Sequence, residues 1–340
     1  MYDDKAETKT YINNMPINNL SNMVKYTKPA LTFKEQVKLL QDRGLQITNI
    51  DSVEGILSNI SYYRLSAYML PFKKRNTQGC VVDEFIEGAT WENVYNLYKF
   101  DRKLRLLVFD AIERLEVSFR TQIIYQLSHK YGSHWQDNEN IFKKEFKTKK
   151  DGTQKVLDPY TEIQKQIKEQ LNSNNSEVFI KHYTEKYDTP TNPPSWMCVE
   201  ILYFNQLSKI CNGLKARADI SGIALFYDLP PETFCSWLHS INYIRNICAH
   251  HSRLWNRDIK LTPKIFYRSK NKIWLSSTDD IRRNKIYYIL CMINFLLQTV
   301  NPESNFKTRL FDLLDKYKDC VNLYAMGFLK EWRKEKMWSL

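Results

Sequence analysis

Glycine is scarce in this chain, with nine residues in a length of 340. β-rich and doubly wound folds normally place glycine at their turns, where the backbone takes a positive φ. The patterns GxGxxG and GxxxxGK[ST], whose glycines let the backbone approach phosphates, do not occur. The scarcity favours a helical fold and gives no support to a nucleotide-binding loop.

Paired cysteines and long apolar runs are also missing. The seven cysteines stand singly, without a CxxC pair, so neither a zinc site nor a disulfide framework is indicated. The longest apolar run, from Ile286 to Val300, is shorter than the ~20 residues that a bilayer requires, and the N-terminus lacks a signal-peptide pattern. We therefore expect a cytoplasmic protein with buried, unpaired cysteines, no metal, no cofactor and no membrane segment.

Positive charge, in contrast, is in excess: 50 Lys and Arg against 38 Asp and Glu give a net charge of +12 at pH 7. Such a surface attracts polyanions by neutralising their charge and releasing counterions. RNA, DNA and anionic membranes all satisfy this description, so the charge alone leaves the partner open.

Apolar residues recur at helical spacing through most of the chain, which predicts an all-α fold: a helical bundle with an additional helical N-terminal region. Residues 1–28 are polar and aperiodic and are predicted to form a tail. The proline-rich segment 189–194 interrupts helical continuity. We expect a boundary there, between a helical N-terminal region, 29–188, and a second helical region, 189–340.

The segment from Thr90 to Tyr131 predicts one or two long helices with a continuous apolar stripe. Glu113, Glu116 and Arg120 fit intrahelical pairing, with bracing of an RNA or dimer surface as the alternative. Opposite charges four residues apart are expected on the more polar faces of this segment: Asp101–Arg105, Asp110–Arg114 and Glu116–Arg120. Further helices are expected at 32–44, from 51, and at 196–214, 231–250, 279–300 and 304–319, whereas 254–277 is less regular and compatible with a short hairpin.

A lysine-rich run follows the long helix and contains an expected turn at Asp151-Gly152. We interpret the run as a solvated loop, with an arm that contacts RNA phosphates as the alternative. Its cations are Lys143, Lys144, Lys147, Lys149 and Lys150.

The end of the expected helix 231–250 carries the candidate site. If its polar side chains were buried without partners, each would cost ~1–3 kcal/mol, so we expect them to face a cleft or another protomer. They share one narrow stripe at ~100° per residue: His239, Asn242, Asn246 and His250.

The residue types around this stripe suit RNA cleavage without a metal. Attack of a 2′-hydroxyl on phosphorus needs a proton acceptor, a proton donor and positive charge on the phosphorane oxygens. His250 can exchange a proton at cellular pH, Arg245 can clamp a phosphate, and Asn246 can orient either group. The alternative is a purely structural helix end, in which the helix dipole stabilises Arg245 and His250.

The residues after this stripe are weaker candidates for RNA contact. His251 projects ~100° away from His250 on an ideal helix. Arg253 and Arg257 place two cations around the indole of Trp255, an arrangement that suits phosphate pairing and base stacking. Trp255 fits a packing role in the core equally well.

Arg245-Asn246 followed by His250 matches the RNxxxH form of the Rx4–6H motif of HEPN domains. The motif alone occurs readily by chance, but its context is more specific. The segments SYYRLSAYMLPF, LYKFDRKLRLLVFDAIERLEVSFR, SWMCVEILYF, RNICAHHSRLWNR and MGFLKEWRKEKMW, in this order, resemble the bacterial abortive-infection family of AbiD/AbiF type. The resemblance runs from about residue 32 to 338. One departure is Asn205, where the family pattern leads us to expect glycine.

The resemblance implies a HEPN-type helical protein of phage defence or of toxin type, in which Arg245, Asn246 and His250 cleave RNA. HEPN nucleases usually assemble their site from two facing motifs, so a single RNxxxH implies a homodimer. Members of the AbiF group are associated with a small non-coding RNA that restrains the protein. Two rival functions stay open: a module that binds RNA without cleaving it, and a sensor that binds a phage component.

Overall fold

The computed structural model describes residues 26–148 and 154–339, with side chains between 145 and 157 left aside. The expected tail therefore lies almost wholly outside the described residues. The chain divides into two compact units, 1–91 and 92–340, which we describe separately.

In the part of the first unit that the structure describes, three α-helices accompany a two-stranded antiparallel ribbon. Thr32 and Glu35 form a capping box that starts its first helix, because each side chain accepts the other's backbone N–H. Buried leucines and valines of the helices make its core. Its elements are α2 (Phe33–Asp42), α3 (Ile50–Asn59), α4 (Tyr62–Met69), η2 (Leu70–Phe72), β1 (Lys73–Arg75) and β2 (Val81–Phe85).

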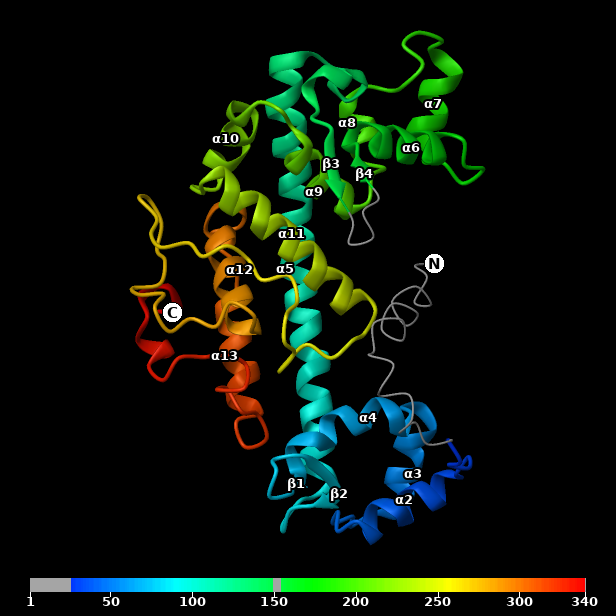
Figure 1. Ribbon diagram of the computed structural model, residues 1–340, viewed down its shortest axis with the longest axis vertical. Coiled ribbons are helices and arrows are strands. Elements are labelled where there is room, and N and C mark those ends of the chain that lie inside the picture. The colour runs from blue at the N-terminus through cyan, green and yellow to red at the C-terminus, as the bar shows by residue number, and fades with distance from the viewer. Residues whose placement is uncertain (1–25, 149–153, 340) are drawn as a thin grey trace. The chain divides into compact units, whose positions relative to one another are not determined.

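The second unit is organised around α5, a single helix from Trp91 to Tyr131, as its apolar stripe predicted (Figure 1). Leu104, Val108, Leu115 and Ile123 of that stripe are fully buried. The other elements are η3 (Trp135–Asp137), η4 (Glu139–Ile141), β3 (Glu145–Thr148), β4 (Gln154–Leu157), α6 (Pro159–Leu171), α7 (Val178–Lys186), α8 (Ser195–Cys198), α9 (Phe204–Gly213), α10 (Arg217–Phe226), α11 (Pro231–Ala249), α12 (Ile286–Val300), α13 (Phe306–Lys316), η5 (Trp332–Lys334) and η6 (Lys336–Trp338).

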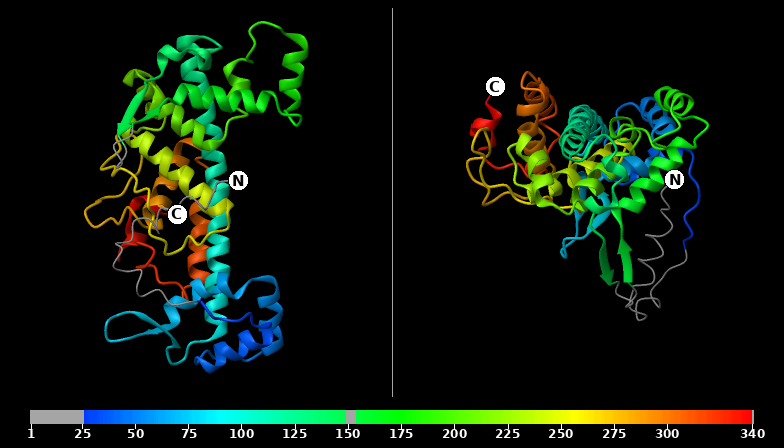
Figure 2. Two further views of the ribbon diagram at one scale, coloured as in Figure 1. Left: turned by 45° about the vertical axis from the view of Figure 1, so that its right-hand side comes forward. Right: turned by 90° about the horizontal axis from the view of Figure 1, so that it is seen from above.

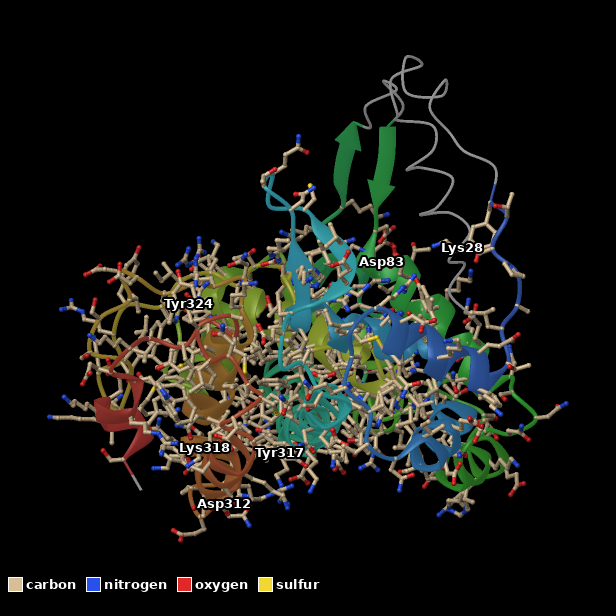
Figure 3. The ribbon with its side chains drawn as sticks, turned by 90° about the horizontal axis from the view of Figure 1, so that it is seen from below. Lys28, Asp83, Asp312, Tyr317, Lys318 and Tyr324 are labelled. Carbon is tan, nitrogen blue, oxygen red and sulfur yellow. The ribbon has the colours of Figure 1, made fainter. Side chains whose placement is uncertain are left out.

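Helices α11, α12 and α13 pack beside α5 (Figures 1 and 2). The ring of Tyr317, just after α13, meets Phe100 of α5 at 5.9 Å between centroids, whereas Asp312 and Lys318 are exposed (Figure 3). Aromatic rings of this kind supply much of the core. The all-α prediction is confirmed, because the described strands form only two short ribbons.

The expected helix 196–214 is interrupted. Helix α8 ends at Cys198, and α9 starts at Phe204. At the break, Nη1 of Arg120 on α5 donates to the carbonyl oxygen of Val199 at 2.5 Å. Asn205 lies in the first turn of α9, where its Oδ1 is covered without a hydrogen-bond partner in the described residues.

Other local predictions also need correction. The lysine-rich run enters a ribbon in which β3 pairs with β4 in antiparallel register, from Glu145–Leu157 to Thr148–Gln154. No strand forms between 254 and 277, all of which the structure describes. The last two helices start later than expected, at Ile286 and Phe306.

The proline-rich segment lies within the second unit. The backbone N–H of Ser195 donates to the carbonyl of Ser133 at 2.7 Å, and Gln136 donates to the carbonyl of Pro193 at 3.0 Å. These bonds join the two sides of the expected boundary, which stays a prediction. Within the described ranges, no helix is both long and apolar enough to cross a membrane.

Candidate functional site

Helix α11 starts with Pro231 in its first turn, where a missing N–H costs nothing, and ends at the cap residue His250. The backbone N–H of His251 bonds to the carbonyl of Cys248, and that of Ser252 to the carbonyl of Ile247, at 3.1 and 3.0 Å. These two bonds define a Schellman motif, whose left-handed position usually holds glycine. Here that position is His251, with φ 54°.

The polar stripe is not uniformly exposed. His250 and His239 are exposed and Asn246 is half-buried, but only 8% of Asn242 is accessible. His239 Nδ1 lies 3.4 Å from the hydroxyl of Ser208 on α9. The open part of the stripe is therefore its C-terminal turn, which contains the RNxxxH residues.

Arg245 is held by two side chains of α5. Its Nε lies 3.9 Å from Glu116 Oε2, and its guanidinium carbon lies 5.7 Å from the centroid of the Phe109 ring. The Nε atom is covered, yet 39% of the side-chain surface is exposed. Glu116 and Phe109 thus cover one part of the guanidinium and leave the rest accessible.

Glu116 connects two arginines. Its other oxygen accepts from Arg120 Nη2 at 2.6 Å, which confirms the intrahelical pair that the spacing predicted. Arg120 is itself buried and bound to the carbonyl of Val199. The same carboxylate therefore bonds Arg120 within α5 and forms a long ion pair, without a hydrogen bond, with the motif arginine.

Asp101 was expected on a polar face of the long helix, and this prediction was wrong. Its side chain is fully buried and pairs with Arg105, which is also buried. Its Oδ1 accepts the backbone N–H groups of Leu254 and Trp255, at 3.0 and 2.7 Å. A buried carboxylate needs such partners, and this one fixes the turn that follows RNxxxH.

Asp101 was not among the site residues that the sequence predicted. A carboxylate four residues before an arginine is also found in surface ion pairs. Charge spacing alone therefore cannot distinguish a buried pair from an exposed one. The only signal was the position of Asp101 three residues before Leu104, which starts the apolar stripe.

The residues after the motif divide into two groups. Trp255 is 2% exposed, so in this structure it packs in the core and cannot stack on a base. Arg253 and Arg257 are half-buried, and Arg257 Nη1 lies 3.4 Å from the carbonyl oxygen of Arg253. The two arginines remain RNA-contact candidates, as does the exposed His251.

The lysine-rich run is only partly described. Lys144 pairs with Glu139 at 2.5 Å and with Asp158 at 3.4 Å. The hydrogen bond that Lys144 donates to Glu139, followed by the charge of Asp158, raises the pKa of the lysine. The half-buried Lys143 donates its backbone N–H to the carbonyl of Gly213 at 2.8 Å. The Lys147 side chain, Lys149, Lys150 and the expected Asp151-Gly152 turn lie outside the described residues.

Neither a thiol nucleophile nor a clustered metal site accompanies the motif. Burial raises the pKa of the Cys248 thiol to about 12, so this cysteine stays protonated at neutral pH. Among the residues that the structure describes, no three His, Cys, Asp or Glu side chains are grouped to hold a metal ion. The accessible polar chemistry of the helix end is that of Arg245, Asn246 and the neighbouring histidines.

Comparison with known protein families gives one match. The family of Abi-like proteins matches residues 55–256, which include α5 and the RNxxxH segment. Because the match covers more than half of the chain, the protein belongs to the Abi-like family. Neither the curated proteins nor the solved structures gave a match.

Proposed function

We propose that this Abi-like protein is a metal-independent endoribonuclease of HEPN type that acts in abortive infection against phage. The observation that carries the proposal is the placement of Arg245, braced by Glu116 with part of its guanidinium accessible, and of the exposed His250 within the last two turns of α11. Arg245 can bind a phosphate through its planar fork, and His250 can carry a proton.

In the proposed reaction, the 2′-oxygen of the target nucleotide attacks the adjacent phosphorus and loses its proton. The bond from phosphorus to the 5′-oxygen breaks, and that oxygen takes up a proton. The products are a 2′,3′-cyclic phosphate and a 5′-hydroxyl end. Arg245 would stabilise the phosphorane charge, while Asn246 would orient the phosphate or the imidazole.

The reaction needs a proton acceptor and a proton donor, yet each chain has one RNxxxH sequence. A homodimer with facing helix ends would supply two copies of His250, one for each role. This arrangement is the one that the resemblance to HEPN nucleases implies.

A cognate small non-coding RNA is proposed to restrain the enzyme until infection. Support comes from the resemblance to the AbiF group and from the net charge of +12, which suits an RNA partner through counterion release. Cellular or phage RNA would be the target once the restraint is lost.

Transcriptome-wide mapping of new 5′-hydroxyl RNA ends tests the function. Wild type, His250→Ala and His239→Ala would each be induced without flanking DNA, so that no cognate small RNA is supplied. His239 is the matched control, because it is an exposed histidine on the same helix. We expect new ends with wild type and His239→Ala only. The nuclease proposal fails if wild type, stable and bound to RNA, produces none, and an RNA-holding module then replaces it.

A further inference from the structure

The segment that follows the motif carries most of the chain's excess charge. Between Arg253 and Lys285 there are ten Lys and Arg residues and three Asp, a net charge of +7 within a chain total of +12. The cations are Arg253, Arg257, Lys260, Lys264, Arg268, Lys270, Lys272, Arg282, Arg283 and Lys285.

The backbone of this segment is irregular but firmly attached to α11. Ser240 donates its hydroxyl to the carbonyl of Leu261 at 3.0 Å. One turn earlier, Trp237 Nε1 donates to the carbonyl of Lys264 at 3.0 Å, and Ser236 accepts the Lys264 N–H at 2.8 Å. The segment therefore runs antiparallel to α11, back from its RNxxxH end.

The attachment continues past the start of α11. Asp228, in the turn before the helix, accepts hydrogen bonds from the Ser269 hydroxyl and from the backbone N–H of Asn271, the latter at 3.2 Å. Gln298 of α12 bonds both the N–H and the carbonyl of Ile273, at 3.0 and 2.8 Å. Fixed bonds at both ends make this stretch a preformed surface, so binding to it loses little conformational entropy.

The cations of the segment serve two purposes. Lys272 reaches the carbonyl of Tyr227 at 2.9 Å, Arg283 that of Pro263 at 2.9 Å, and Lys285 pairs with Asp258 at 2.8 Å. These three hold the segment in place. Four others are exposed, and none forms an ion pair with a described acidic residue: Lys260, Lys264, Arg268 and Lys270.

One aromatic ring accompanies these four cations. Tyr267 is 70% exposed and lies between Lys264 and Arg268 in the chain. Single-stranded nucleic acids are bound by a row of cations that follows the backbone and by aromatic rings on which bases stack. A row of one cation every few residues, with a single tyrosine, fits a strand better than the broad apolar face that a membrane requires.

We infer that the exposed side chains of residues 260–270, here called the basic track, bind single-stranded RNA and guide it to or from the RNxxxH end of α11. The guiding role rests on the proposed nuclease function, whereas binding by the basic track does not. Lys260, Lys264, Arg268 and Lys270 contact phosphates, and Tyr267 stacks on a base.

The test compares two variants of equal charge. The track variant replaces Lys260, Lys264, Arg268 and Lys270 by Gln. The control variant replaces four exposed lysines of α6 and α7 by Gln: Lys165, Lys168, Lys181 and Lys186. Both are made in full-length protein carrying His250→Ala, so that binding of a labelled oligouridine is measured without cleavage, and circular dichroism checks folding.

Loss of four phosphate contacts should reduce the slope of log K against log salt by about 3, and weaken binding about tenfold or more at low salt. The control variant should keep the wild-type slope. Tyr267→Ala should weaken binding by about tenfold with the slope unchanged, because stacking is not ionic. If the track and control variants bind oligouridine equally, the inference is overturned. Binding to phosphatidylserine vesicles is measured in parallel, and a track variant that loses vesicle binding but keeps RNA binding also overturns the inference.

Cleavage separates this inference from the proposed function. If wild type with intact His250 does not cleave, but the track variant loses RNA binding, the basic track stands and the nuclease does not. The four track substitutions are therefore also made in protein with intact His250. If that protein binds and cleaves RNA as wild type does, the nuclease stands and the basic track does not.

Discussion

Two parts of helix α11 can be compared, because Trp237 lies in the core whereas the RNxxxH end opens to solvent. In the first half, Trp237 is 1% exposed and packs in a cluster with Phe266, Trp274 and Phe295. The centroids of contacting rings in this cluster lie 5.3–5.9 Å apart. In the second half, polar residues reach the surface and the helix ends at the exposed His250. Changes in the first half should affect stability, and changes in the second half should affect function.

The largest loss of stability is expected from Trp237→Ala. Removing the indole leaves a cavity among aromatic rings and breaks the bond to Lys264, so the free energy of unfolding should fall by about 3–5 kcal/mol. Urea denaturation would measure it, with Trp196→Ala as the control, since Trp196 is 48% exposed. Similar losses of unfolding free energy in the Trp237→Ala and Trp196→Ala variants would contradict the core role assigned to Trp237.

Asp101→Asn should have the next largest effect. An amide can still accept a bond from the turn at Leu254, but it cannot neutralise Arg105, so we expect a loss of about 2–3 kcal/mol. Asp110→Asn is the matched control on the same helix. Its partner is Arg309 at 2.6 Å on a part-exposed surface, and such pairs contribute about 1 kcal/mol or less. Equal stability of the two variants would show that Asp101 is not the anchor.

Arg245→Ala should change stability by less than about 1 kcal/mol, because the guanidinium is part-exposed. RNA cleavage should fall by about 10²–10³-fold, the usual effect of removing one group that stabilises developing charge. Arg245→Lys keeps the charge without the planar fork and should restore only part of the activity. A large fall in melting temperature with Arg245→Ala would place the residue in the structural half instead.

The smallest effect is expected from His251→Gly. The left-handed φ of 54° is unfavourable for a side chain with a β-carbon, and glycine should raise stability by up to about 1 kcal/mol. Cleavage should fall far less than with His250→Ala, because His250 is the proposed proton carrier and His251 is a candidate only for RNA contact. Thermal melting and RNA cleavage would be measured on the same samples, with His251→Ala as the variant that keeps the strain. Loss of cleavage in both variants would move the catalytic role to His251.

The comparison also shows what the sequence can and cannot predict. Helical periodicity predicted α5 and α11, because their apolar residues recur over many turns. At the break between α8 and α9, the Val199 carbonyl accepts a bond from Arg120, about 80 residues away, and no local pattern reports such a contact.

The candidate site was predicted in part. The spacing of Arg245, Asn246 and His250 is local, so the sequence contains it in full. The brace from Glu116 and the anchor at Asp101 depend on how two helices cross, which periodicity does not determine. Burial of Trp255 was one of two open alternatives, because a tryptophan fits a core and a stacking surface equally well.

The central claim is that the exposed end of α11 is catalytic. Purified wild type, His250→Ala and His239→Ala would be incubated with one RNA in the presence of EDTA, and product ends and melting temperature would be measured together. We expect 2′,3′-cyclic phosphate and 5′-hydroxyl ends for wild type and His239→Ala, none for His250→Ala, and equal melting temperatures for all three proteins. Undiminished cleavage by a folded His250→Ala protein would contradict it.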